Sequence, residues 1–184
     1  MVVWRYTSAG ALDTSFDGDG IAVFDNAAGG NGDDWGQGIT IDDQGRILVS
    51  GGSVNAAGNN DMALWRLNSN GSLDTSFNND GFVTHNNAAG GNDDDEGGFS
   101  ILIDDDGKIW VPGTSTNAAG NLDMVLWRFD TNGNLDTSYD GDGFYIEGNV
   151  AGGNNIDYMI RIAFDSDNNI IGVGGGRLDC YLEQ

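Results

Sequence analysis

The stretch "DMALWRLNSNGSLDTSFNNDGF" occupies residues 61–82, and the chain contains two further versions of it. One begins at Met1 as "MVVWRYTSAGALDTSFDGDGI", and the other begins at Asp123 as "DMVLWRFDTNGNLDTSYDGDGF". The tetrapeptide "LDTS" starts at Leu12, Leu73 and Leu135, so the period is 61 to 62 residues. A period of this length is typical of stacked or radially arranged units. We predict one repeat domain over residues 1–184, with repeats at 1–61, 62–123 and 124–184.

Each repeat contains four short apolar runs separated by clusters of Gly, Asn and Asp. In the first repeat the expected strands are 2–6, 21–24, 38–42 and 46–52. No stretch has apolar residues at helical spacing over more than one turn. Short runs joined by turns such as "DDQG" (42–45) and "DDDG" (104–107) predict a four-stranded antiparallel meander.

We expect the blade to be ordered outward from the "GITID" strand (38–42) through "RILVSGG" (46–52), the strand with the Trp-Arg pair, and "GFVTH" (81–85). Both faces of the Trp-Arg strand, the third in this order, are largely apolar, which indicates a sheet covered on both sides. Trp4, Trp65 and Trp127 occupy one face, and Val3, Leu64 and Leu126 occupy the other. A blade between two neighbouring blades has this property. We therefore predict an all-β, β-propeller-like fold with three four-stranded antiparallel blades per chain. A β-solenoid is the alternative, although its repeats are usually shorter.

The repeated Trp-Arg pair has a structural and a functional interpretation. Tryptophans at one strand position are typical of packing between blades, and carbohydrate stacking is the competing hypothesis. A buried guanidinium needs a partner. We expect interblade ion pairs that join the repeated arginines to the aspartates of "LDTS", namely Arg5, Arg66 and Arg128 with Asp13, Asp74 and Asp136.

Two segments carry a resemblance to a known family. "RLNSNGSLDTSFNNDGF" (66–82), followed by "IDDDGKIWVPG" (103–113), resembles the delta-60 repeat of large bacterial surface and secreted proteins. All three units match the first segment, and the first two match the second. The third unit departs from it and has "FDSDNNIIGVGG" at 164–175. The resemblance implies a propeller-like, extracellular bacterial repeat protein, and it supplies no catalytic residues.

Charge and composition exclude several classes of protein. The chain has 29 acidic and 7 basic residues, giving a net charge of -22, which disfavours nucleic acid and anionic membranes as partners. There is no apolar run long enough for a membrane-spanning helix. The start has no basic segment followed by an apolar stretch, so we expect no signal peptide within this sequence. Cys180 is the only cysteine, so no disulfide forms within the chain. Because Met1 aligns with Met62 and Met124, we expect a portion of a longer protein or a gene that starts at a repeat boundary.

Two acidic groups are candidate binding sites. The "NAAGGN"-type loops and the "NAAGN" loops should share one face of the propeller. The acidic residues that follow the former should surround the mouth of the central channel and bind a glycan or protein ligand: Asp33, Asp34, Trp35, Asp93, Asp94, Asp95, Glu96 and Asp157.

We expect the "DDQG" and "LDTSFDGDG" turns to share the opposite face. There, "DGDG" (17–20), "NNDG" (78–81) and "DGDG" (140–143) place oxygen ligands at alternate positions. Calcium takes six to eight oxygens, often from Asp and Asn in turns. Ordinary tight-turn chemistry is the competing interpretation. The candidate calcium ligands are Asp17, Asp19, Asp80, Asp140 and Asp142.

Catalysis has little support from residue counts, since His85 is the only histidine and Lys108 the only lysine. We expect a non-enzymatic binding and assembly module, with a carboxylate-based carbohydrate-active enzyme or a structural spacer as alternatives. Three blades do not close a ring. The start of the chain offers the third strand of a blade, and residues 159–165 and 169–175 offer a first and second strand. We therefore predict a homodimer that closes a six-bladed ring, with a degenerate strand at 178–184.

Overall fold

The computed structural model describes residues 1–150 and 156–176, and within them it is an all-β structure of thirteen strands. Every pairing between these strands is antiparallel. The same residues include no helix that is long and apolar enough to cross a membrane. Cys180 and the strand expected at 178–184 lie outside the described residues.

The first complete sheet is a four-stranded meander in the order β3-β4-β5-β6. Its strands are β3 (Gly29–Ile41), β4 (Ile47–Asn55), β5 (Asn60–Leu67) and β6 (Phe82–His85). The register places Val49 opposite Trp65 and Ser50 opposite Leu64. The predicted strand order, from the "GITID" strand outward, is confirmed.

The second complete sheet repeats this order, with its innermost strand divided in two. Its strands are β7 (Gly90–Gly97), β8 (Leu102–Ile103), β9 (Ile109–Asn117), β10 (Leu122–Phe129) and β11 (Phe144–Glu147). Both β7 and β8 pair with β9. Val111 lies opposite Trp127 and Pro112 opposite Leu126, which is the register of the first sheet.

The remaining strands form two half-sheets, one at each end of the described chain. The N-terminal pair is β1 (Val2–Trp4) and β2 (Ile21–Val23), and the C-terminal pair is β12 (Asp157–Phe164) and β13 (Ile170–Gly176). By sequence equivalence, β1 and β2 are the outer strands of a blade, and β12 and β13 are inner strands. The described residues therefore form two complete blades and two halves, and not three complete blades, because each sequence repeat starts in the middle of a sheet.

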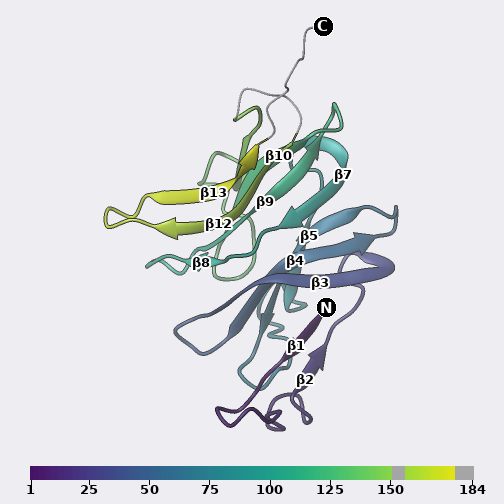
Figure 1. Cartoon of the computed structure of the whole chain (residues 1–184), viewed down its shortest axis with the longest axis vertical. Coiled ribbons are helices and arrows are strands. Elements are labelled where there is room, and N and C mark those ends of the chain that lie inside the picture. Colours follow the sequence, from purple (N-terminus) through teal and green to yellow (C-terminus); the bar gives the residue numbers. More distant parts are fainter. Residues whose placement is uncertain (151–155, 177–184) are drawn as a thin grey trace, which may run out of the picture.

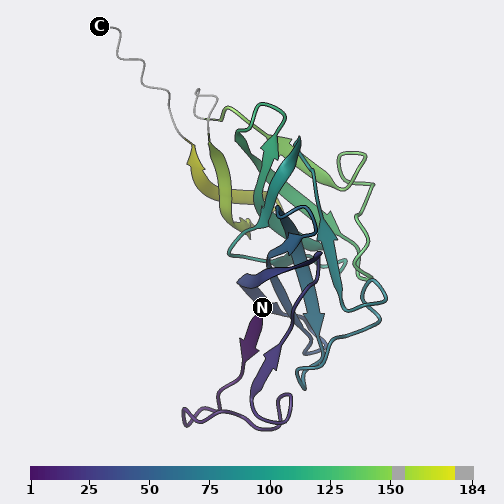
Figure 2. The same cartoon turned by 90° about the vertical axis from the view of Figure 1, so that its right-hand side faces the viewer.

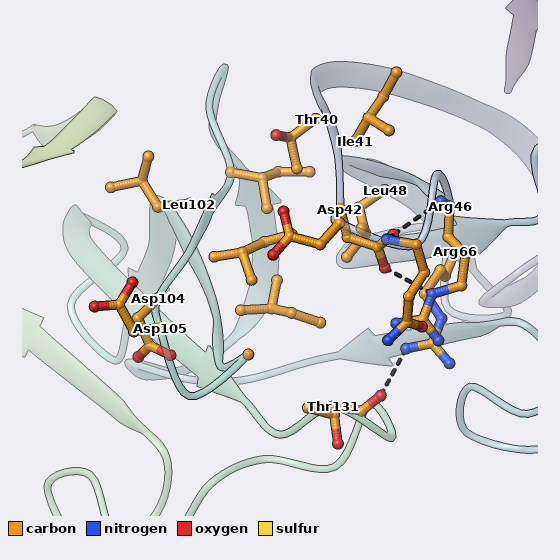
Figure 3. Close-up of a pocket in the computed structure, with 16 residues that line it drawn as sticks. Thr40, Ile41, Asp42, Arg46, Leu48, Arg66, Leu102, Asp104, Asp105 and Thr131 are labelled. Atoms are coloured by element: carbon orange, nitrogen blue, oxygen red, sulfur yellow. Dashed lines mark hydrogen bonds and ion pairs between the residues drawn. The ribbon is translucent and has the colours of Figure 1, made fainter.

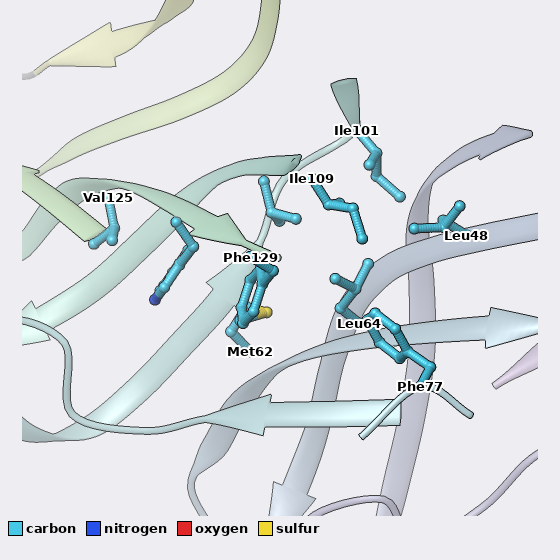
Figure 4. Packing of buried hydrophobic residues seen from close by; sticks show 10 residues of the cluster. Leu48, Met62, Leu64, Phe77, Ile101, Ile109, Val125 and Phe129 are labelled. Atoms are coloured by element: carbon cyan, nitrogen blue, oxygen red, sulfur yellow. The ribbon is translucent and has the colours of Figure 1, made fainter. Parts of the chain in front are cut away.

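The sheets follow one another from β1 and β2 at one end of the molecule, through the first complete sheet, to the second complete sheet, and β12 and β13 lie beside that second sheet (Figures 1 and 2). No closed ring is present among the described residues. Side chains between successive sheets form the core. In Figure 4, Leu48, Leu64 and Phe77 of one sheet and its outer loop meet Ile109 and Phe129 of the next.

The repeated tryptophans lie in these interfaces. Trp65 packs with Met1, Val3 and Ala22 of the N-terminal half-sheet and is 1% exposed. Trp127 occupies the next interface and is fully buried. At these two positions the packing interpretation is confirmed.

The acidic hairpin turns are held by their own aspartates. Asp42 Oδ1 accepts the backbone N–H groups of Gln44 and Arg46, and Gly45 supplies the positive φ of 76°. Asp165 Oδ1 accepts the N–H groups of Asp167 and Asn169 in the same way. This explains why the divergent third unit still forms a hairpin.

Candidate functional site

The acidic residues predicted at the channel mouth lie within strands and not in loops. Asp33, Asp34 and Trp35 belong to β3, Asp93–Glu96 to β7, and Asp157 to β12. The strands start earlier than the apolar pattern indicates because Gly29 and Gly90, both at φ +82°, redirect the backbone into them. Polar side chains along a strand do not prevent pairing where one face contacts solvent.

Three of these carboxylates hold the loop that precedes each inner strand. Asp34, Asp95 and Asp157 each accept the backbone N–H of an asparagine eight residues earlier, Asn26, Asn87 and Asn149. These asparagines have φ values of 63° to 66°. Asp95 and Asp157 are 1% and 2% exposed. The geometry therefore gives all three a structural role.

Asp94 and Glu96 connect neighbouring blades. Asp94 Oδ1 accepts the backbone N–H of Asn60 at 2.8 Å, and Glu96 Oε1 accepts the Asn60 side-chain amide at 3.0 Å. Asn59 Nδ2 also donates to the carbonyl of Asn92. The "NAAGN" loop thus contacts the next "NAAGGN" region, and the prediction that these loops share one face is confirmed. Asp33 and Asp93 are exposed.

Burial raises the pKa of three acids in this region. It raises the pKa of Asp95, with a further contribution from the charge of Asp61, while hydrogen bonds from Ser115 and the loop N–H groups oppose the shift. It also raises the pKa of Glu96, with Asp94 adding to the effect, and the pKa of Asp61. The acidic residues are thus not electrostatically equivalent, although their sequences repeat.

A small pocket of about 230 Å³ lies beside Glu96. Gln37, Phe99, Thr114 and Tyr158 line it, together with Gly97, Gly98, Gly113, Leu122, Met159 and Ile160. Phe99 is 50% exposed and Tyr158 is 39% exposed. Of the eight predicted ligand residues only Glu96 contributes to it. The sequence reasoning missed Phe99 and Tyr158 because neither recurs as an aromatic at its position in all repeats.

A larger cleft of about 510 Å³ lies between the inner hairpins of the two complete blades. Figure 3 shows Asp42, Arg46 and Arg66 on one side and Asp104 and Asp105 on the other, with aliphatic side chains between them. Most of the polar groups already have partners. Arg46 Nε contacts Asp42 Oδ2 at 2.6 Å, and Asp104 Oδ2 accepts the indole N–H of Trp110.

The repeated arginine-aspartate pairs are present, but each lies within one repeat. Arg5 Nε meets Asp13 at 3.0 Å and Arg66 Nε meets Asp74 at 2.8 Å. Arg128 Nη2 meets Asp136 Oδ2 at 2.9 Å. The expectation of interblade ion pairs is therefore wrong, because the chain turns back after the arginine and brings the "LDTS" aspartate to it. Arg5 and Arg66 reach the next repeat through Nη1 instead.

Hydrogen bonding and the charge of neighbouring cations lower the pKa of the Asp136 carboxyl. Lys108 Nζ donates to Asp136, Ser138 also donates to it, and Arg128 adds its charge, so the pKa of Asp136 lies well below its ordinary range. The "DDDG" hairpin, which contains Lys108, thus contacts the "LDTS" loop. Arg46 Nη1 and Asp74 Oδ2, 3.6 Å apart, make the same contact in the preceding blade. The prediction that these turns share a face is confirmed.

The predicted calcium ligands have turn-forming roles. Asp17 and Asp140 have φ values of 50° and 49°, in the left-handed region. Asp19 Oδ1 and Asp142 Oδ1 accept the N–H groups of Ile21 and Phe144. Asp80 is exposed in the equivalent turn. Within residues 1–150 and 156–176, no three His, Cys, Asp or Glu side chains gather in a way that could hold a metal ion. Calcium binding stays a prediction.

Two segments of the chain match a known family model. Residues 45–77 and 105–139 match the family described as a domain of unknown function (DUF5122) beta-propeller. Each matched segment starts in an inner hairpin, continues through the second and third strands of a blade, and ends in the "LDTS" loop. The matches cover less than half of the chain, and they support the propeller fold without indicating an activity. A search of curated proteins found no match.

Proposed function

We propose that the chain is a non-enzymatic assembly module that joins a second copy of itself to form a six-bladed propeller on the outside of a bacterial cell. One observation carries the proposal. Trp4 is 56% exposed, whereas Trp65 and Trp127, at the same position of complete blades, are 1% and 0% exposed. Exposed apolar surfaces of this kind are typical of interaction sites.

Two exposed apolar surfaces argue for assembly. The leading surface is formed by the apolar side chains that face away from the second sheet: Val2, Trp4, Tyr6, Ile39 and Ile41. Ile39 is 62% exposed, although the equivalent Ile101 and Ile162 are 5% and 6% exposed. Ile101 and Ile162 pack against a preceding blade. Ile39 occupies the same strand position, but among the described residues no inner strands of a preceding blade cover it.

The second surface, here called the trailing surface, consists of Tyr145, Ile171 and Val173. Ile171 is 58% exposed, while the equivalent Leu48 and Trp110 are 1% and 7% exposed against a following blade. In the closed ring, the leading surface of one chain covers the trailing surface of the other. Each chain therefore lacks the neighbour that its partner supplies.

The two half-sheets also have complementary strand edges. Among the described residues, β1 pairs only with β2 and β13 only with β12. The register of the complete sheets, in which Ser50 and Pro112 oppose Leu64 and Leu126, places Val173 opposite Val3 of the partner. This pairing turns β12, β13 and the partner's β1 and β2 into one four-stranded blade. It also covers strand edges that otherwise invite uncontrolled association.

The number of blades fits closure. The described residues of each chain form two complete blades and two halves, so two chains would make six blades, within the roughly four to eight that propellers use. The net charge of -22 on each chain opposes association. Salt screens this repulsion, so the dimer should be more stable at higher ionic strength.

Light scattering with a surface variant tests the proposal. The wild-type chain should have twice its 19.4 kDa mass. Ile39→Asp places a charge on the leading surface, so it should give a monomer with an unchanged circular dichroism spectrum. A wild-type monomer at all accessible concentrations would refute the assembly function. An unaffected Ile39→Asp dimer would refute the surface that we assign to it.

The pocket beside Glu96 supports a second candidate function, carbohydrate recognition. Two exposed aromatic rings, Phe99 and Tyr158, lie there beside the Glu96 carboxyl and the Gln37 amide. Aromatic rings with a few polar groups form sites that orient small ligands. Glycan-array binding that is lost in Phe99→Ala would support this function, and hydrolysis of labelled polysaccharide that is lost in Glu96→Gln would favour the carbohydrate-active enzyme. An inactive, non-binding wild type would remove both.

A further inference from the structure

A second contact between successive repeats involves the arginines of the Trp-Arg pairs. Arg5 Nη1 donates to the carbonyl of Ser69 at 2.5 Å, and Arg66 Nη1 donates to the carbonyl of Thr131 at 2.6 Å. Both arginines also hold their own "LDTS" aspartate through Nε. Each guanidinium is thus shared between its own repeat and the turn of the next one.

A backbone hydrogen bond accompanies each arginine. The N–H of Asp17 donates to the carbonyl of Asn70 at 2.7 Å, and the N–H of Asn78 donates to that of Asn132 at 2.7 Å. The turns fit closely at these points. A Cβ on Gly133 would lie 2.8 Å from the ring of Phe77.

Arg128 occupies the third position of this series and has a different arrangement. Its Nη2 bonds Ser138 Oγ at 2.7 Å and meets Asp136, while its Nε is buried without a hydrogen-bond partner. Arg128 Nη1 makes no hydrogen bond within residues 1–150 and 156–176. The guanidinium lies 5.0 Å from the ring centres of both Trp110 and Tyr139. In Arg5 and Arg66, which contact the turn of the following repeat, Nε donates to the "LDTS" aspartate. In Arg128, Nε makes no such hydrogen bond.

The turn of the first repeat is the complementary part. Ser8, Ala9 and Gly10 are equivalent to Thr131, Asn132 and Gly133, and all three are exposed. Gly10 has the same left-handed backbone, at φ +84°, but a Cβ on it would have nothing within 4 Å. The space beside Gly10 is open, whereas the equivalent Gly71 and Gly133 pack against the rings of Phe16 and Phe77.

We infer that Arg128 and the backbone N–H of Asp140 bind the 8–10 turn of a second copy of this chain. Arg128 Nη1 donates to the partner's Ser8 carbonyl, Asp140 N–H donates to the partner's Ala9 carbonyl, and Tyr139 covers the partner's Gly10. Arg128 Nε then turns to Asp136, as in the two earlier repeats. The inference rests on the proposed assembly. It adds the residues that orient one copy relative to the other, because strand pairing alone permits slippage by two residues.

Two matched arginine variants test the inference. Arg128→Lys keeps the charge and loses the Nη1 donor, so the dimer dissociation constant, measured by sedimentation over a dilution series, should rise about 10- to 100-fold. Arg66→Lys removes the same chemistry from an internal contact, so it should lower the melting temperature of the dilute monomer and leave the dissociation constant within about threefold.

Hydrogen exchange supplies a readout that a purely structural role of Arg128 would not change. The Asp140 amide should exchange slowly in the concentrated dimer, like that of Asn78, and quickly in the dilute monomer. A dimer with an unprotected Asp140 amide and an unchanged dissociation constant for Arg128→Lys would overturn the inference and leave the assembly intact. A wild type that is monomeric throughout would overturn both.

Discussion

Removing Trp65 and Trp4, one at a time, separates the energy of folding from the energy of assembly. The two residues occupy the same strand position, but Trp65 is 1% exposed and Trp4 is 56% exposed in a single chain. Burying a tryptophan removes about 150–250 Å² from water. At about 25 cal/mol per Å² this gives roughly 4–6 kcal/mol, an upper estimate, and buried Trp→Ala changes cost about 3–5 kcal/mol.

Trp65→Ala should therefore lower the unfolding free energy by about 3–5 kcal/mol at every protein concentration. Trp4→Ala should cost roughly 1–2 kcal/mol in a dilute monomer, because less than half of its side chain is buried there. In the concentrated dimer its cost should approach that of Trp65→Ala, since the partner's trailing surface buries the rest.

Urea unfolding followed by circular dichroism, at protein concentrations on both sides of the dimer dissociation constant, measures these differences. A cost below about 1 kcal/mol for Trp65→Ala would place its ring at the surface and revive the stacking hypothesis. A Trp4→Ala cost that does not change with concentration would contradict burial by a partner.

Three further predictions concern pH, turn packing and cations. Burial lowers the pKa of His85, and its Nδ1 accepts the Trp127 indole N–H at 3.2 Å. Neutral His85 therefore stabilises the fold. Its contribution should be complete above about pH 6.5 and disappear as the pH falls to the folded-state pKa, and the unfolding free energy should change by at most about 1.4 kcal/mol per pH unit in that range. His85→Gln should remove that slope in melts between pH 5 and 8, and an unchanged slope would exclude His85 as its source. In the dilute monomer, Gly133→Ala should destabilise by about 2–4 kcal/mol and Gly10→Ala by about 1–2 kcal/mol, because both strain the backbone but only Gly133 contacts Phe77; equal losses would contradict the packing. Millimolar calcium should raise the melting temperature more than magnesium does, and identical curves in calcium and EDTA would remove the metal site.

The repeat period was sufficient to predict the strand order and the packing of Trp65 and Trp127. It did not show where a blade begins, since a periodic sequence can be divided at any point. Only the pairing of β1 with β2 and of β12 with β13 reveals that, in the part of the chain that the structure describes, two blades are complete and two are halved.

The candidate sites were harder to predict because acidic and Asn/Gly patterns serve turns and ligands alike. Asp34, Asp95 and Asp157 bind loop N–H groups, which depends on a chain reversal that composition does not encode. The pocket beside Glu96 combines Phe99, in the break between β7 and β8, with Tyr158 of β12. A search for repeated residues does not find such a site.

Disulfide trapping between β13 of one chain and β1 of another tests the proposed ring most directly. In the expected register Val173 of one chain lies opposite the partner's Val3, so their Cα atoms should be about 4.5–5.5 Å apart, within reach of a disulfide. Chains carrying Val3→Cys and Val173→Cys, each with Cys180→Ser, should form a covalent dimer when mixed under mild oxidation. Val23→Cys in place of Val3→Cys should not cross-link, because β2 lies one strand farther from β13. Efficient trapping of the Val3–Val173 pair alone supports blade completion between two copies; no cross-link, or equal cross-linking of the control, would contradict it.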